Sequence, residues 1–284
     1  MKPQSERSQE YISALNEIAE PLPYRKDVPI ILLFSGGKGS ALAAYLLKHQ
    51  GYTKVILYFN DTKTEDPDLY RFTKEVTDFL NFHVIEDSDG RDIWQVFKDN
   101  RFMGKDGADL CSRILKRERS AKFRAKFDPD LFLFANGIDI WEEHRLNDAI
   151  PIWEPYCLVA PLVDAKVFDK GLLWDIFFSE SGIKEPYLYT IGMQHNNCGG
   201  FCVKAGLAHY RQLLEKDRER YLYFEKKEIE VYQHIGKAYP FLRKTINKVR
   251  YYITLRQYRL FLESGRPLDD DDKNDFGGCM ACAI

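Results

Sequence analysis

The sequence lacks long hydrophobic runs and carries almost no net charge. None of its apolar stretches approaches the roughly 20 residues that a membrane-spanning helix needs. The 41 basic and 43 acidic side chains leave a net charge of −2 over 284 residues, which argues against a general attraction to nucleic acid or to membranes. The first residues are polar and lack the apolar core of a signal peptide. We therefore expect a cytoplasmic protein with no membrane partner.

Cysteine is also scarce, with six residues in the chain. In a cytoplasmic protein of this length, close cysteine pairs indicate metal or redox chemistry rather than a disulfide framework. Hydrophobic residues make up 45% of the chain, which is ordinary for a globular protein and allows a substantial core in one or two domains.

Strand and helix patterns alternate through the first half of the chain. After an N-terminal helix at 5–20, the predicted strands are 29–34, 54–59, 82–86 and 130–136, and the predicted helices are 40–49, 67–80, 91–99 and 111–126. This alternation predicts an α/β fold with a doubly wound, mostly parallel sheet, in which ligands bind beyond the carboxyl ends of the strands.

The second half of the chain has a different pattern. Residues 141–187 look irregular and aromatic, with one helix at 169–180. The segment from Lys204 to Glu263 is predicted to be mainly helical, and an acidic linker follows at 269–275. We divide the chain into an N-terminal helix and linker (1–27), a nucleotide-binding domain (28–160) and a mainly helical, cysteine-bearing region (161–284).

The most informative segment is the loop Ser35–Ser40, which reads Ser-Gly-Gly-Lys-Gly-Ser. It lies between an apolar strand, Val28–Phe34, and a helical segment, Ala41–Leu47. Glycines allow backbone N–H groups to converge on an anion, and the following helix adds its positive dipole end. The spacing differs from a Walker A loop and from a dinucleotide fingerprint. The loop therefore predicts a different kind of nucleotide phosphate site.

The loop resembles the PP-loop of the ATP pyrophosphatase superfamily, usually Ser-Gly-Gly-x-Asp-Ser, with Gly39 in place of the Asp. An ordered series of further segments resembles the phosphoadenosine phosphosulfate (PAPS) reductase-like branch of bacterial and phage proteins. These segments are Tyr58–Thr62, Glu65–Phe72, Cys111–Glu118, Asn136–Ile138, Glu142–Arg145 and His195–Cys202. The resemblance implies a PP-loop (HUP-like) domain that cleaves ATP between the α- and β-phosphates or binds an adenylyl sulfate.

The resemblance also implies a set of nucleotide-binding residues. Those in the loop are Ser35, Gly36, Gly37, Lys38, Gly39 and Ser40, and those outside it are Asp61, Thr62, Arg113, Lys116 and Gly137. Asp61 and Thr62 could instead cap a turn, and most cations of 111–126 could instead form a solvated helix face. The absence of Asp at position 39 leaves open how Mg²⁺ is held, and it allows a protein that binds ATP without cleaving it.

The catalytic groups that we predict are Lys116, Arg145 and Asp61. Lys116 and Arg145 would stabilise charge on the phosphates together with Mg²⁺. Arg145 could hold a phosphate or a substrate carboxylate with its planar fork, or it could form a surface ion pair.

Four cysteines form two glycine-flanked pairs, Cys198 with Cys202 and Cys279 with Cys282. Four thiolates suit tetrahedral Zn²⁺ or a [4Fe–4S] cluster, and the ligand type does not choose between them. A shared site would require the C-terminal tail to fold back. His195 could be a further ligand or a packing residue, and we expect Cys111 to be a packed side chain.

The favoured function is ATP α,β-cleavage that adenylates an acceptor, for sulfur transfer or for modification of a nucleic acid or nucleoside. The partners would be an adenine nucleotide, a nucleic acid or modified-base acceptor and a sulfur-donor protein. One alternative is a thiol-dependent sulfonucleotide reductase that uses Cys279, although its usual Glu-Cys-Gly-like tail is absent. Another is a catalytically silent nucleotide sensor or scaffold. The basic and aromatic run 243–259 could bind nucleic acid, but we favour a helix that is basic outside and aromatic inside.

Overall fold

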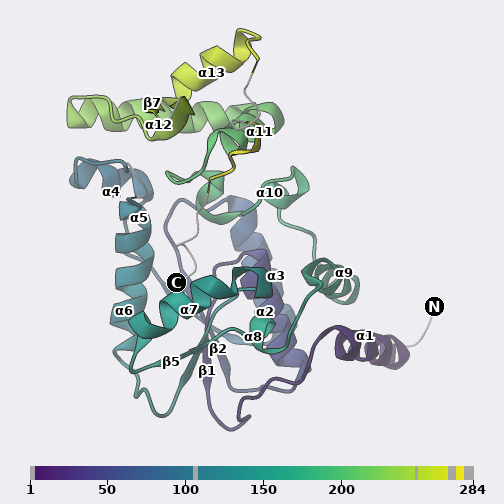
Figure 1. Ribbon diagram of the computed structural model, residues 1–284. Coiled ribbons are helices and arrows are strands. Elements are labelled where there is room, and N and C mark those ends of the chain that lie inside the picture. The colour runs from purple at the N-terminus through teal and green to yellow at the C-terminus, as the bar shows by residue number, and fades with distance from the viewer. Residues whose placement is uncertain (1–3, 105–107, 247–248, 268–272, 278–284) are drawn as a thin grey trace.

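The computed structural model describes residues 4–104, 108–246, 249–267 and 273–277. At its centre is a five-stranded sheet with the order β3-β2-β1-β4-β5, in which all neighbours are parallel (Figure 1). The strands are β1 (Ile30–Leu33), β2 (Val55–Asn60), β3 (His83–Asp87), β4 (Leu133–Ala135) and β5 (Cys157–Val159). The chain order reverses beside β1, so the doubly wound α/β prediction is confirmed.

Helices cover both faces of the sheet because its strands are apolar on both sides. In β1, Ile30 and Leu32 contribute to one core and Ile31 to the other, as expected for side chains that alternate. The first core also holds α2 (Lys38–His49), α3 (Pro67–Leu80) and α9 (Lys170–Ser181). The second holds α6 (Glu118–Arg124) and α7 (Glu143–Trp153).

A third core lies at one end of the sheet and joins four helices. They are α4 (Ile93–Asp99), α11 (Leu207–Lys216), α12 (Arg218–Ile235) and α13 (Leu255–Glu263). Figure 1 shows α11, α12 and α13 gathered above the sheet. The remaining helical segments are α1 (Gln4–Ile18), α5 (Leu110–Ser112), a π-helical turn (Arg113–Arg117), α8 (Pro161–Asp164), α10 (Tyr187–Thr190) and two short 3-10 helices (Ile140–Glu142 and Asn197–Gly200). No helix in the described ranges is both long and apolar enough to cross a membrane.

The expected helix over 204–263 is wrong at 242–253. There, β6 (Leu242–Ile246) and β7 (Val249–Ile253) form an antiparallel hairpin. The run is rich in Thr, Ile, Val and Tyr, which favour strands, and a spacing of two residues between two such runs is typical of a hairpin.

The expected irregular stretch at 141–187 is also wrong, because it contains α7 and β5. Pro151 lies near the end of α7, and such a residue usually signals a helix break. The predicted boundary at residue 160 stays a prediction, although α9 packs into the same core as α2. Of the predicted acidic linker, residues 268–272 lie outside the described residues.

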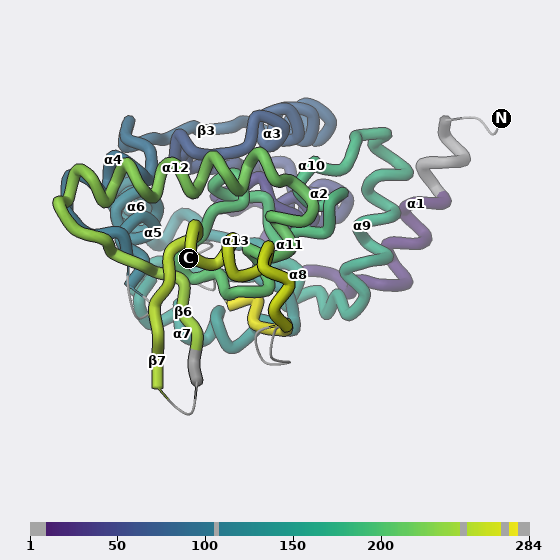
Figure 2. The backbone as a smooth tube through the Cα atoms, turned by 90° about the horizontal axis from the view of Figure 1, so that it is seen from above, coloured from purple at the N-terminus to yellow at the C-terminus, as the bar shows by residue number. Residues whose placement is uncertain are grey.

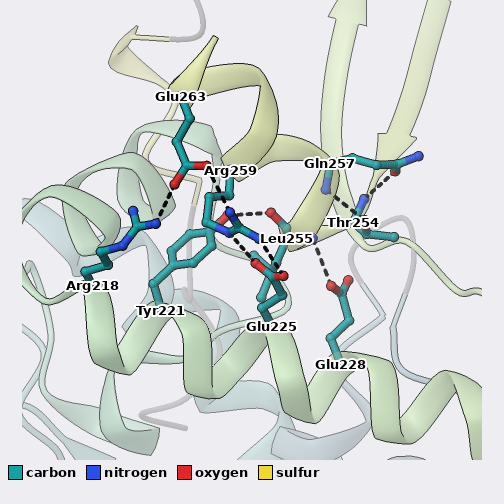
Figure 3. A network of polar contacts seen from close by, with 9 residues as sticks. All are labelled: Arg218, Tyr221, Glu225, Glu228, Thr254, Leu255, Gln257, Arg259 and Glu263. Atoms are coloured by element: carbon teal, nitrogen blue, oxygen red, sulfur yellow. Dashed lines mark hydrogen bonds and ion pairs between the residues drawn. The ribbon is translucent and has the colours of Figure 1, made fainter. Parts of the chain in front are cut away.

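A buried carboxyl group ties α12 to the start of α13 (Figure 3). Glu228 has an exposed fraction of 0%, and it accepts hydrogen bonds from the Tyr232 hydroxyl and, at 2.9 Å, from the Leu255 amide. Burial raises the pKa of Glu228 to about 7 against the opposing effect of these bonds. On the neighbouring turn, Glu225 is paired with Arg259.

We expect Glu228 to make the protein less stable as the pH rises. Its folded pKa exceeds its unfolded value, so its stabilising effect is complete below about pH 4.5 and is lost as the pH rises through about 7. The loss should be on the order of 3 kcal/mol. Urea unfolding of wild type and Glu228→Gln between pH 5 and 8 measures it. The difference between the two proteins should change with pH, and a constant difference would contradict the assignment.

Candidate functional site

The loop Ser35–Ser40 lies at the point where the strand order reverses, between the carboxyl ends of β1 and β4. The Ser40 hydroxyl accepts from the Ser35 amide at 3.2 Å and donates to the Gly37 carbonyl at 3.0 Å. Gly36 has φ +70°, and a Cβ there would lie 2.7 Å from the Thr73 hydroxyl. The loop is therefore held by its own serines and by glycine-specific geometry, as a preformed anion site requires.

The unusual glycine at position 39 has a packing reason. A Cβ on Gly39 would lie 2.3 Å from the Gly137 carbonyl oxygen, and a Cβ on Gly137 would lie 2.3 Å from the Ser40 amide nitrogen. Backbone meets backbone here, so neither position has room for a side chain. The space that a side chain at position 39 would take is filled by the loop after β4.

The loop borders a cavity of about 300 Å³, at the lower end of the range for ligand sites. Ser35, Gly37, Lys38, Gly39 and Ser40 line it from the loop, and Gly137 and Arg145 line it from other segments. The N-cap residue of α2, Gly37, has no side chain to cap the helix, so first-turn amides other than that of Lys38, which donates to the Tyr189 hydroxyl, are left for a ligand. The structure thus brings together most of the predicted phosphate-binding residues around an open space.

Cations predominate around this cavity. Lys38, Arg145 and Lys170 line it, whereas Glu142 is its one carboxylate among the described residues. Burial lowers the pKa of Lys38, and the charge of Lys170 lowers it further. An anionic ligand would relieve this repulsion. Lys170 was missed from the sequence, because an isolated lysine at the start of a helix carries no pattern.

Arg145 is the predicted catalytic group that does reach the cavity. It is 8% exposed, and its guanidinium donates through Nη1 to Glu142. Its buried Nε has no hydrogen-bond partner. A largely buried arginine that lines a cavity can pair with an anionic ligand through its guanidinium group. Arg145 also borders a second, more apolar cavity between α6 and α7.

The motif His195–Cys202 contributes to the loop site in a way that sequence reasoning missed. The Asn196 side chain donates to the Gly36 carbonyl at 3.2 Å, and the Tyr189 hydroxyl accepts from the Lys38 amide at 3.0 Å. These two contacts hold the loop from a segment about 150 residues further along the chain. Because these contacts join segments far apart in the sequence, the only signal for them in the sequence was that residues 189 and 196 are polar.

His195 and His209 line the same cavity, with their rings stacked at 5.3 Å. Burial and the nearby His209 lower the pKa of His195 to about 3, so its ring is neutral at physiological pH. Its Nδ1 is buried and has no partner. His195 is thus a neutral polar group facing the cavity rather than a cation.

Asp61 lies at the end of β2 and is occupied by local contacts. It accepts from the Tyr70 hydroxyl and from both the amide and the ammonium of Lys63, each at 2.7 Å. Burial alone would raise the pKa of Asp61, but these hydrogen bonds lower it. Its geometry matches the turn-capping alternative. Neither Asp61 nor Thr62 lines the loop cavity.

Arg113 and Lys116 both lie on the π-helical turn but have different surroundings. Arg113 is exposed and pairs with Glu118 at 3.7 Å. Lys116 is buried and lines a third, very small cavity of about 20 Å³ together with Thr62 and His195. Neither lines the loop cavity, so their predicted roles at the phosphates stay predictions.

The small cavity is also lined by three cysteines, Cys111, Cys198 and Cys202. Cys198 has φ +52°, and its amide donates to the buried Glu65. Burial raises the pKa of the Cys198 thiol to about 12, so it is protonated at neutral pH. Cys111, expected to be a packed side chain, thus lies beside the predicted metal pair.

The predicted zinc or iron–sulfur site does not form from the described residues alone. Within the described ranges, no group of three or more His, Cys, Asp or Glu side chains is arranged to hold a metal ion. Cys279 and Cys282 lie outside the described residues, so the four-thiolate site stays a prediction. The last described residues do fold back, because the Phe276 carbonyl accepts from the Gly206 amide at 3.0 Å. Phe276 and Gly277 also line the loop cavity.

Comparisons with known proteins give matches only among solved structures. No model of a known protein family matches the sequence, and no curated protein matches it. An NH3-dependent NAD synthetase from Campylobacter jejuni subsp. jejuni NCTC 11168 is similar at 13% identity and a TM-score of 0.39, covering 83% of this chain and 94% of that chain. An NMN synthetase from Francisella tularensis is similar at 16% identity and a TM-score of 0.37, covering 68% and 82%.

A third similar structure is the U34-tRNA thiolase NcsA from Methanococcus maripaludis with its [4Fe-4S] cluster. It has 13% identity and a TM-score of 0.43, covering 98% of this chain and 88% of that chain. Because the identities and TM-scores are low, we draw no conclusion from them about substrate or activity. The PAPS reductase-like branch stays a prediction.

Proposed function

We propose that the chain binds ATP in the loop cavity and cleaves it between the α- and β-phosphates. The observation that carries this proposal is the cavity itself. A glycine-built loop, the start of α2 and the cations Lys38, Lys170 and Arg145 line one polar space at the reversal point of the sheet. Such an arrangement suits a polyphosphate better than a neutral ligand.

In the proposed reaction, an oxygen nucleophile of the acceptor attacks the α-phosphorus of ATP. The bond from that phosphorus to the oxygen bridging to the β-phosphate breaks, and pyrophosphate leaves with the electron pair. The loop amides and Arg145 stabilise the negative charge that grows on the phosphate oxygens. A sulfur or amine nucleophile then displaces AMP from the adenylated acceptor, which is the step that sulfur transfer or nucleoside modification requires.

Mg²⁺ fits this site only as a companion of ATP. Glu142 is the one carboxylate among the described residues that line the cavity, and it already pairs with Arg145. Mg²⁺ is commonly held by one or two carboxylates together with substrate phosphates. Bound in that way it would neutralise phosphate charge.

Product analysis with labelled ATP tests the proposal. We expect AMP and pyrophosphate, with little ADP, when a suitable acceptor or water takes the adenylyl group. Lys122→Gln, on the exposed side of α6, serves as a matched control and should leave the products unchanged. Release of ADP and phosphate would contradict the proposal. Tight ATP binding with no cleavage would favour the nucleotide sensor instead.

A further inference from the structure

The cavity between α6 and α7 is larger than the loop cavity, and the proposed phosphate chemistry does not use it. Its volume is about 730 Å³, which is within the range of small-molecule sites. Figure 2, seen from above, shows both helices on the opposite side of the molecule from α1. The two cavities are neighbours, because Arg145 lines both. A molecule bound between α6 and α7 would therefore lie next to a nucleotide held by the loop.

Small and apolar side chains give this cavity its space. Ala121 lines it from α6 and Ala149 lines it from α7, where Ala149 is 1% exposed. The buried Trp153 lines it at the end of α7. Between Arg145 and Trp153 the helix rises by about 12 Å. The cavity therefore suits an elongated ligand with an apolar body.

A cation without an acidic partner lies at the Trp153 end of the cavity. The Arg124 guanidinium is 4.4 Å from the centre of the Trp153 ring and donates to the Ile152 carbonyl at 3.1 Å. No carboxylate pairs with Arg124 in the part of the chain that the structure describes. Partial burial lowers the pKa of Arg124, because it disfavours the charged form. An anionic group of a ligand would supply the missing charge partner.

The other charged groups that line the cavity do not neutralise Arg124. Arg117 is held by the two oxygens of Asp109, at 2.8 and 2.9 Å. The lining carboxylates, Glu118 and Asp148, are exposed, and neither forms an ion pair with Arg124. The charge of Arg124 is therefore left for a ligand.

We propose that this cavity holds the acceptor of the proposed reaction, and that the acceptor is a small organic anion with an apolar body. The inference rests on the proposed function, because only a chain that transfers an adenylyl group needs an acceptor. The anionic group would pair with Arg124, and the apolar body would lie on Ala121 and Ala149. The other end would reach Arg145, beside the loop cavity, where the acceptor oxygen would meet the α-phosphorus. Arg124 favours this occupant over a neutral apolar molecule.

Two dyes that differ by one charge test the proposal. Anilinonaphthalene sulfonate is an organic anion with an apolar body, and phenylnaphthylamine has the same body without the sulfonate. In fluorescence titrations the wild type should bind the anionic dye more tightly than the neutral one. Arg124→Gln should weaken binding of the anionic dye about tenfold, as for one lost bond to a charged group, and leave the neutral dye unaffected. Ala121→Phe, which fills the cavity from its exposed side, should weaken both.

The matched control is Lys122→Gln, which removes an exposed charge on α6 outside the cavity and should bind both dyes like the wild type. Circular dichroism identifies the folded variants. If Arg124→Gln does not fold, Asp148→Asn gives the same test, because it removes a lining negative charge and should tighten binding of the anionic dye alone, by about twofold.

Three results would overturn the proposal. They are the absence of anionic dye binding to the folded wild type, equal losses of both dyes in Arg124→Gln, and equal losses in Arg124→Gln and the control. Displacement of the bound dye by saturating ATP would also overturn it, because the cavity would then belong to the nucleotide site.

Product analysis with labelled ATP separates this inference from the proposed function. If ATP yields no AMP while dye binding still depends on Arg124, the acceptor role is wrong together with the proposed function, and an anion-binding cavity remains. If AMP forms but dye binding does not depend on Arg124, the acceptor site alone is wrong and the proposed ATP cleavage stands.

Discussion

Gly39→Asp, which introduces the residue that PP-loops usually have here, should abolish nucleotide binding. The new Cβ would lie 2.3 Å from the Gly137 carbonyl oxygen. Because that oxygen belongs to the backbone, it cannot move aside as the end of a flexible side chain would. We expect a loss of about 2–4 kcal/mol in the free energy of unfolding, as for an overpacked core site. Urea unfolding and calorimetric titration with ATP measure the two effects.

Two further variants sharpen this test. Gly137→Ala should reproduce the effect from the other side of the contact, because its Cβ would lie 2.3 Å from the Ser40 amide nitrogen. Gly171→Ala is the control, since its Cβ would meet only the Asp169 side chain at 3.3 Å. If Gly39→Asp were as stable as wild type and bound ATP equally well, the contact between the two glycines would not be the constraint.

Arg145→Gln should lower the rate of pyrophosphate release by about 100- to 1000-fold, the usual cost of removing one group that stabilises transition-state charge. Arg145 is buried beside the loop cavity and has an unused Nε donor. The rate for Arg145→Lys should lie between those of the wild type and Arg145→Gln, because lysine keeps the charge but lacks the planar guanidinium fork. Single-turnover assays with saturating ATP measure the chemical step.

A change in KM alone would contradict this role and assign Arg145 to ground-state binding. Glu142 loses its ion-pair partner in these variants, so melting temperatures must be compared first. Lys122→Gln provides the exposed control for a lost positive charge. These results separate a catalytic loss from a folding defect.

Much of the fold could be predicted from local patterns. The apolar runs that became β1, β2 and β4, and the helices between them, follow the spacing of hydrophobic residues and the positions of Gly and Pro. The hairpin at 242–253 could also have been found, because its strand-forming residues flank the pair Asn247 and Lys248. It was missed because the alternation of charge and aromatic residues was assigned to a helix.

The candidate site was only partly visible in the sequence. The loop residues and Arg145 were found, because glycine spacing and a charged motif carry local information. Lys170, Tyr189 and Asn196 were not, since single polar residues in ordinary segments show no pattern. The role of Asp61 stays a prediction: its position after a strand suggested a ligand contact, and in the structure its side chain contacts Lys63 and Tyr70.

The sequence by itself determined the alternation of strands and helices up to β4 and the glycine-rich form of the loop, because both depend on residues that are neighbours along the chain. Only the tertiary structure decided that Gly39 must lack a side chain and that Arg145 and Lys170 share a cavity with the loop. It also separated Lys116 from that cavity and placed it among three thiols. These outcomes depend on how the sheet order and helix packing bring distant segments together, which no local pattern specifies.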